Sequence, residues 1–340
     1  MLYLLRPIER HARRHLATER DRLRFDRARR FVDESEKRGR ADGSAYRIHA
    51  RWLKFLCSSA AVQKDIWPED ADFLCRFAAA FGLPPAQRDG FVGLALLGRL
   101  WRAWSYDEMM RGPPELVGRV TRVEGWERFE RCRGDGAGVI VLPVHGQFAR
   151  LFQRYLRHRG HDGLELGITN DQLEHRAIRT PVAKRFELAR QMHAAKHALA
   201  RGGIVFNLPD ARQNLDNARS VEFFGRQRRI AAGFAELALK TGAHAIPAAF
   251  RFSPRGFFVF EFGEPFVVPP QSASHEERVA SLVGQYAAFL REEWSRYPWN
   301  IDWTHLRHYL LLPKDDPARG EIAEAAQVRE ARPVGEGLAR

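Results

Sequence analysis

The spacing of hydrophobic positions changes near Pro113. Before it, apolar residues recur at intervals of three and four, which predicts amphipathic helices separated by proline-containing breaks. The first of these segments is dominated by Arg, Glu and Asp and predicts a solvated helix with one weak apolar stripe. We therefore expect a helical N-terminal region over residues 1–112. The predicted helices cover residues 1–36, 46–62, 69–81 and 86–110.

After Pro113, short continuous apolar runs alternate with longer segments of helical spacing. The run VIVLPV, residues 139–144, is typical of a parallel strand buried on both faces. This alternation predicts an α/β domain over residues 113–312, and the charged, Ala- and Glu-rich residues 313–340 are expected to be disordered. The other predicted strands cover residues 164–168, 204–208, 245–252 and 257–262, and the helices cover residues 147–159, 187–201, 231–241 and 276–297.

The chain is strongly basic. Its 340 residues carry a formal net charge of +13, which favours an anionic partner such as a membrane surface or a phosphate-bearing ligand. A general preference for arginine in the genome would give the same excess, so both readings stay open. The basic residues are spread along the chain and form no zinc-finger or RNA-recognition signature, so no specific nucleic-acid partner is expected.

The cysteines and the apolar segments bear on the compartment. Cys57, Cys75 and Cys132 are odd in number and widely spaced, which predicts neither a disulfide framework nor a metal site. We find no secretory signal and no run of the ~18–20 apolar residues that span a bilayer. We expect a cytoplasmic protein that can lie on the inner face of the cytoplasmic membrane through its N-terminal helices. Nothing in the sequence indicates the oligomeric state.

Two polar residues follow predicted neighbouring strands. His145 comes directly after residues 139–144, and Asp210 follows residues 204–208. Catalytic groups in α/β folds collect at the carboxyl ends of parallel strands, and an imidazole can act as a general base near neutral pH. A strand-end histidine that only satisfies backbone groups is an equally good interpretation at this point.

An ordered set of motifs over residues 115–305 resembles the lipid A biosynthesis late-acyltransferase (lauroyl/myristoyl acyltransferase) family. The set comprises VIVLPVHGQFAR, GGIVFNLPDARQ, VEFFG, IPAAFRF and the C-terminal YPWNIDW. The resemblance implies a glycerolipid-acyltransferase-like α/β fold, a helix-flanked mixed sheet that is largely parallel. It also implies an acyltransferase, of the class that transfers groups other than amino-acyl. No bound cofactor is implied. The expected donor substrate and partner is acyl carrier protein or coenzyme A carrying a fatty thioester, and the acceptor is a hydroxyl or amine, of a lipid, a glycolipid or a more soluble molecule.

One position departs from that family's pattern. Its signature is a histidine, four residues, then Asp or Glu, whereas here His145 is followed by Arg150, and none of the 13 histidines has an acidic residue five positions later. A carboxylate would orient the imidazole and stabilise the imidazolium, whereas a guanidinium only donates hydrogen bonds and opposes protonation. Two interpretations follow. In the first, Asp210 substitutes as the acid, with Asp171 as a weaker candidate. In the second, the protein is a catalytically impaired relative that binds acyl chains or acyl carrier protein.

The remaining motif positions predict substrate binding. The resemblance places the FFG element where acceptor and acyl chain meet, and the arginines suit a phosphate or carboxylate group. The alternative interpretations are core packing for the phenylalanines and solvated surface positions for the arginines. No metal ligands are expected. The candidate binding residues are Arg176, Arg179, Phe223, Phe224, Gly225, Arg226 and Arg228.

Overall fold

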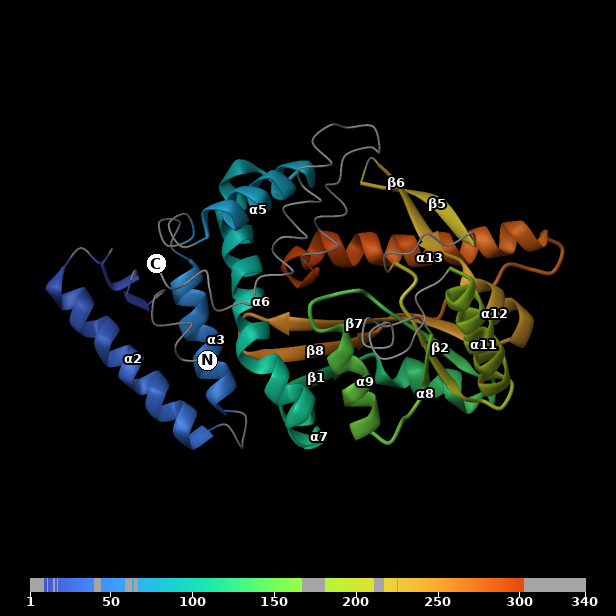
Figure 1. The fold of residues 1–340 in the computed structure, drawn as a ribbon, viewed down its shortest axis with the longest axis horizontal. Helices are drawn as coiled ribbons and strands as arrows, with labels where there is room; N and C mark the ends of the chain where they lie inside the picture. Colours follow the sequence, from blue (N-terminus) through green and yellow to red (C-terminus); the bar gives the residue numbers. More distant parts are fainter. Residues whose placement is uncertain are drawn as a thin grey trace.

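The computed structural model describes residues 9–10, 12–14, 16, 18–39, 44–58, 63, 67–166, 181–210, 217–224 and 226–302. Its first part is helical, as predicted. The longest helix of this region, α6, packs against α3 and α5, and α2 packs on the far side of α3 (Figure 1). No helix among these residues is both long enough and apolar enough to cross a bilayer. The helices are α2 (Glu19–Gly39), α3 (Ser44–Cys57), α5 (Pro68–Ala80) and α6 (Pro85–Arg111).

The second part contains a six-stranded sheet in the order β1-β8-β7-β2-β4-β3. The four strands β7, β2, β4 and β3 are mutually parallel, β8 runs antiparallel to β7, and β1 is parallel to β8. The predicted α/β class with a mixed, largely parallel sheet is confirmed. The strands are β1 (Thr121–Glu124), β2 (Val139–Pro143), β3 (Leu164–Leu166), β4 (Ile204–Asn207), β7 (His244–Ser253) and β8 (Phe257–Phe262).

Helices cover both faces of this sheet. Figure 1 shows α13 along one face, with α8 and α9 along the other. All residues of β2 are buried because the strand has a neighbour on each side and helices above and below, which explains its continuous apolar run. The helix α13 begins with a capping box, in which Ser274 and Glu277 satisfy each other's backbone N–H groups. The covering helices are α8 (Trp126–Gly134), α9 (Ala149–His158), α11 (Pro181–Leu199), α12 (Gly233–Thr241) and α13 (His275–Arg296).

Several elements were not predicted from the sequence. They include α7 (Pro114–Arg119), β1, α8, and a separate hairpin of β5 (Ala218–Phe223) and β6 (Arg226–Ala231). The hairpin strands read ARSVEF and RQRRIA, so neither carries the apolar run by which buried strands are recognised. The edge strand β1 alternates half-buried and exposed residues over only four positions.

A buried ion pair joins the sheet to α13. The Arg251 guanidinium on β7 donates to both carboxylate oxygens of Glu293, at 2.7 Å and 2.6 Å, and also pairs with Glu261 on β8. The ring of Tyr297 lies 4.2 Å from the same guanidinium. Because both partners of the Arg251–Glu293 pair are buried, removing Arg251 leaves the charge of the Glu293 carboxylate uncompensated in the interior.

Replacing Arg251 by methionine should therefore destabilise the protein in a pH-dependent way. We expect a loss of about 3–5 kcal/mol in the free energy of unfolding near neutral pH. Burial already raises the pKa of Glu293, against the opposing effect of Arg251. A raised carboxyl pKa costs stability as the pH rises, because the folded state then holds its proton more tightly than the unfolded chain. The variant should thus regain stability as the pH falls toward ~4, the pKa of an unfolded glutamate.

Urea denaturation at neutral and mildly acidic pH measures this effect. The double variant Arg251→Met/Glu293→Met is the control, since it removes both charges and should lose less stability than the single variant. An equal loss in the single variant at both pH values would contradict the prediction.

Candidate active site

The loops after two neighbouring parallel strands meet at one edge of the sheet. His145 follows β2 and Asp210 follows β4, and these strands pair in parallel register. The backbone N–H of His145 donates to Asp210 Oδ2 at 3.4 Å. Asp210 is buried, with 3% of its surface exposed, whereas His145 is only half-buried. The sheet topology therefore brings the candidate base and the candidate substitute acid together.

Asp210 is held from two further directions. The hydroxyl of Tyr286, from α13, donates to Asp210 Oδ1 at 2.8 Å, and the Arg228 guanidinium on β6 donates to the Asp210 carbonyl at 3.1 Å. Burial, together with the neighbouring carboxylate, raises the pKa of Tyr286 well above its ordinary value. The phenol therefore keeps its proton and acts as a donor to the carboxylate.

The other side of the His145 loop is held by η1 (Pro298–Asn300). The backbone N–H of Gln147 donates to the Asn300 carbonyl at 2.9 Å. The Asn300 side chain in turn binds both the N–H and the carbonyl of Phe252 on β7. A Cβ on Gly146 would lie 2.8 Å from the Asn300 carbonyl oxygen, so a side chain at that position would force the two segments apart. The loop is fixed from the sheet side and from the C-terminal side.

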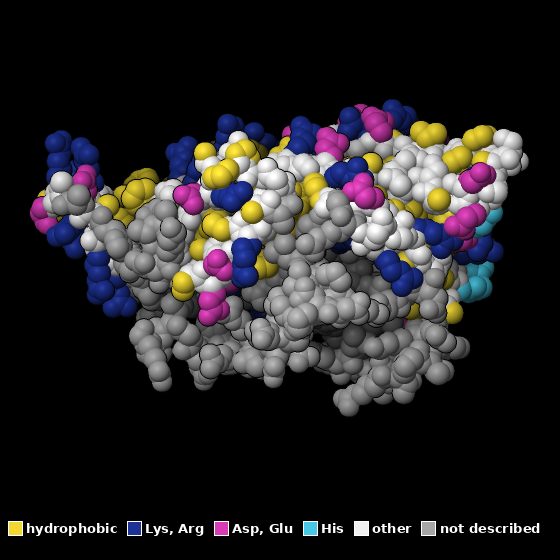
Figure 2. All heavy atoms as spheres, turned by 90° about the horizontal axis from the view of Figure 1, so that it is seen from above, with side chains coloured by type: hydrophobic (Ala, Val, Ile, Leu, Met, Phe, Trp, Pro, Cys, Tyr) yellow, Lys and Arg dark blue, Asp and Glu magenta, His cyan; other side chains and the backbone are white. Residues whose placement is uncertain are grey.

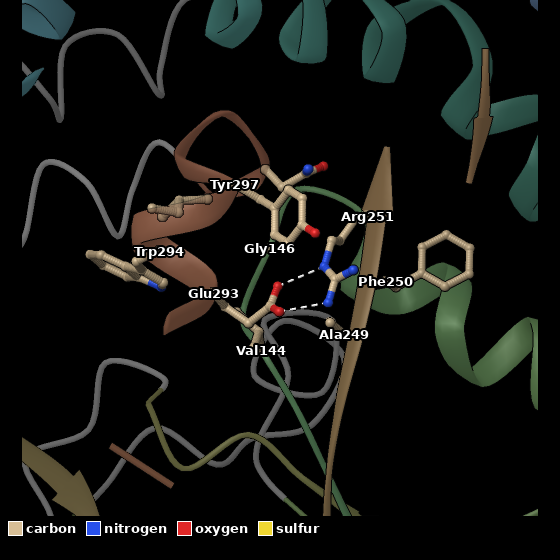
Figure 3. A pocket seen from close by; sticks show the side chains of 10 residues that line it. Val144, Gly146, Ala249, Phe250, Arg251, Glu293, Trp294 and Tyr297 are labelled. Atoms are coloured by element: carbon tan, nitrogen blue, oxygen red, sulfur yellow. Dashed lines mark hydrogen bonds and ion pairs between the residues drawn. The ribbon is translucent and has the colours of Figure 1, made fainter. Parts of the chain in front are cut away.

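A small pocket adjoins this loop (Figure 3). Val144 and Gly146, which flank His145 in the chain, line this pocket. The Arg251–Glu293 ion pair and Tyr297 line it as well. The pocket therefore presents charged and aromatic groups directly beside the loop that carries the candidate base.

Arg150, the position at which the family motif expects an acidic residue, is exposed on the first turn of α9. The helix begins at Ala149, so His145 lies in the preceding loop rather than one turn earlier on the same helix. Because Arg150 is exposed, water and salt screen the charge of its guanidinium.

The paired phenylalanines of the predicted binding element pack within an aromatic cluster. Phe223 is fully buried, and its ring lies 5.2 Å from Trp294 of α13 and 4.8 Å from Phe224. Phe224 reaches across to Phe81, at 4.0 Å, just after α5. The Arg228 guanidinium lies over the rings of Phe223 and Trp294. This element joins the hairpin, α13 and the helical region.

The structure describes only some of the predicted site residues. Asp171, Arg176, Arg179 and Gly225 lie outside the described residues, as does the side chain of Arg226. Within the described chain, no group of three or more His, Cys, Asp or Glu side chains is arranged to hold a metal ion.

The sequence did not indicate three residues that hold the site, namely Tyr286, Gln147 and Asn300. Tyr286 occupies the apolar stripe of α13, where a tyrosine is indistinguishable from core, while Asn300 sits inside the recognised YPWN segment without any signal of its own.

Comparisons with known proteins bear on this site. A family model described as "Bacterial lipid A biosynthesis acyltransferase" matches residues 93–299, from within α6 to η1. No curated protein sequence matches the chain. Among solved structures, the chain is similar to the 1-acyl-sn-glycerophosphate (LPA) acyltransferase PlsC from Thermotoga maritima, with 15% sequence identity and a TM-score of 0.32 over 64% of this chain and 95% of that one. The range matched by the family model includes both His145 and Asp210.

Phe224, in the aromatic cluster, has a left-handed backbone conformation. Its φ of 53° is the only positive value of a non-glycine residue in the described chain, and this left-handed region costs a side-chain-bearing residue about 1–2 kcal/mol. Glycine avoids that strain but loses about 0.5–1 kcal/mol through its freer unfolded chain. We therefore expect Phe224→Gly to be more stable than Phe224→Ala by about 0.5–1 kcal/mol, the reverse of the order found at ordinary positions.

Denaturation midpoints of the two variants, with the parent as reference, measure this order. Both variants lose the contact with Phe81 equally, so their difference isolates the backbone strain. A more stable alanine variant would show that the left-handed conformation is not retained.

Proposed function

Because this chain belongs to the bacterial lipid A biosynthesis acyltransferase family, we propose that it transfers a fatty acyl group from an acyl carrier protein or coenzyme A thioester to a hydroxyl or amine acceptor. The proposed acceptor is a lipid or a glycolipid, and the acyl thioester is a substrate rather than a bound cofactor. The observation that carries the proposal is the meeting of His145 and Asp210 at the carboxyl edge of the sheet, within the range matched by the family model.

In the proposed reaction, the His145 imidazole accepts the proton of the acceptor hydroxyl or amine as that group attacks the thioester carbonyl. The new C–O or C–N bond forms, and the C–S bond breaks when the tetrahedral intermediate collapses. The imidazolium then returns its proton to the departing thiolate, so the base is regenerated. No redox step and no additional reactant are required.

Asp210 is proposed as the acidic group of the site in place of the missing motif carboxylate. Its burial and its hydrogen bond to the His145 backbone support this assignment. A buried carboxylate near the imidazole would stabilise the imidazolium formed during the reaction, which a guanidinium at position 150 cannot do. Arg228, which binds the Asp210 carbonyl, supplies a positive charge on the other side of that residue.

The second candidate function rests on Arg150. In this alternative, the family fold is kept for binding acyl chains or acyl carrier protein and the chemistry is lost. The two functions differ in one measurable property, which is whether the parent protein releases thiol from an acyl thioester.

We further propose that α2 attaches the protein to an anionic membrane surface. Phe25 and Val32 on α2 are buried, while Leu23 and Phe31 are 58% and 59% exposed on the opposite side. At helical spacing, exposed arginines fall on the same side of α2 as the two exposed apolar side chains, and Figure 2 shows Lys and Arg side chains, with some Asp and Glu among them, at this end of the molecule. A helix that presents basic and apolar groups together suits the boundary between anionic headgroups and acyl chains. The exposed arginines are Arg20, Arg24, Arg27 and Arg30.

Thiol release from acyl-acyl carrier protein and acyl-coenzyme A, in the presence of hydroxyl and amine acceptors, tests the reaction. The parent should turn over, and His145→Ala should lose about 10²–10⁴-fold in kcat/KM through loss of the general base. Arg150→Glu serves as the second variant and should leave an active parent active. If the parent is inactive and Arg150→Glu creates turnover, the binding alternative is correct.

Co-sedimentation with vesicles tests the membrane proposal. We expect binding to vesicles that contain phosphatidylglycerol and weak binding to phosphatidylcholine alone. Reversing two charges, in Arg24→Glu/Arg27→Glu, should weaken binding by at least about 30-fold, since each basic residue near an anionic surface contributes ~1 kcal/mol. The control is Arg201→Glu/Arg255→Glu, which makes the same change of charge at exposed positions outside the helical region. Equal weakening in both double variants would mean that net charge, and not α2, determines binding.

A further inference from the structure

A chain of contacts runs from the interior of α13 to the backbone of His145. The Tyr286 hydroxyl lies 2.8 Å from Asp210 Oδ1, and the second oxygen of that carboxylate accepts the His145 N–H at 3.4 Å. The same hydroxyl lies 3.3 Å from the carbonyl of Pro143, the last residue of β2. Tyr286 thus touches both the strand that delivers the histidine and the carboxylate that binds the histidine's backbone.

Packing alone does not require this hydroxyl. Tyr286 is fully buried in the apolar stripe of α13 between Val283 and Leu290, where phenylalanine would fill nearly the same volume. Burying a phenol and a carboxylate together removes both from water, and the hydrogen bond between them offsets that cost without a large net gain in stability. The contact therefore fixes a geometry more than it stabilises the fold.

We infer that Tyr286 is a positioning residue for His145, and that it acts through Asp210; this inference rests on the acyl transfer proposed above. The phenol fixes one carboxylate oxygen, so the plane of the carboxylate is set and its other oxygen is directed at the His145 N–H. Gly146 follows immediately and is conformationally permissive, so the histidine depends on such contacts for a fixed backbone.

The phenol donates over the whole working pH range. Burial and the adjacent carboxylate raise the pKa of Tyr286 well above its ordinary value, and the charge of Arg228 opposes this only in part. The phenol and the His145 N–H contact the two carboxylate oxygens, and Arg228 binds the backbone carbonyl of the same residue. Loss of the hydroxyl removes one hydrogen-bond donor from the Asp210 carboxylate.

The test compares Tyr286→Phe with the matched variant Tyr155→Phe. Tyr155 is also a buried tyrosine, on α9, and has no part in the proposed site. In Tyr286→Phe we expect kcat for acyl-acyl carrier protein to fall about tenfold, with KM unchanged to within about twofold. Hydrogen exchange of the peptide covering residues 143–148 should accelerate about tenfold. Tyr155→Phe should match the parent in all three measurements.

A double-mutant cycle separates positioning from a general structural role. If Tyr286 acts through Asp210, Asp210→Ala/Tyr286→Phe should be no slower than Asp210→Ala alone. Additive losses would overturn the inference. Asp210→Asn provides a second route if Tyr286→Phe does not fold, because an amide has one acceptor oxygen for two donors and should likewise accelerate exchange at residues 143–148. Unchanged exchange in that variant would also overturn the inference.

The two proposals can fail separately. If the parent shows no turnover with any acceptor, acyl transfer is refuted, whatever the exchange data show. If the parent turns over and Tyr286→Phe equals it in kcat, KM and exchange, acyl transfer stands and the role of Tyr286 is refuted.

Discussion

The geometry of the site depends on one buried carboxylate between two strand ends. Asp210 is only 3% exposed, so water cannot solvate its carboxylate. Its oxygens must therefore accept hydrogen bonds from groups of the protein. Two of these donors are the backbone N–H of His145 and the phenol of Tyr286, while Arg228 binds the carbonyl of the same residue. A group that must be satisfied in the interior thereby locks together β2, β4, β6 and α13. The hydrogen bonds that this buried carboxylate requires therefore hold the loops at this edge of the sheet in a fixed arrangement.

The architecture was largely predictable because buried faces of helices and strands require apolar residues at regular spacing in the sequence. The strand β2 is apolar at every position since it is covered on both faces, and β8 was predicted with its observed limits. The hairpin of β5 and β6 was not predictable, because it forms its own two-stranded sheet with mainly polar residues and leaves no such record. Parallel pairing of β2 with β4 also let His145 and Asp210 be expected at one edge.

The remaining site residues could not be predicted, for a different reason. Tyr286 is separated from Asp210 by a long stretch of chain, and its helical spacing is that of any core residue, so only the packed structure brings its hydroxyl to the carboxylate. Asn300 likewise acts through its backbone carbonyl on Gln147 and its amide on Phe252, and a backbone acceptor has no sequence signature. Periodicity reports which face of an element is buried but not which polar atoms meet there.

Close approach of backbones explains why the C-terminal segment matters to a histidine far from it in sequence. A Cβ at Gly98 of α6 would lie 3.1 Å from the Trp299 carbonyl, and one at Gly146 would lie 2.8 Å from that of Asn300. The two glycines allow α6 and the His145 loop to approach η1 closely, where larger residues would separate them. A Cβ at Gly98 would also lie 3.2 Å from the side-chain nitrogen of Gln147, so α6 packs against the loop that carries the candidate base. Any change that lifts η1 would release Gln147 and Phe252 together, so the site and the fold share the same contacts.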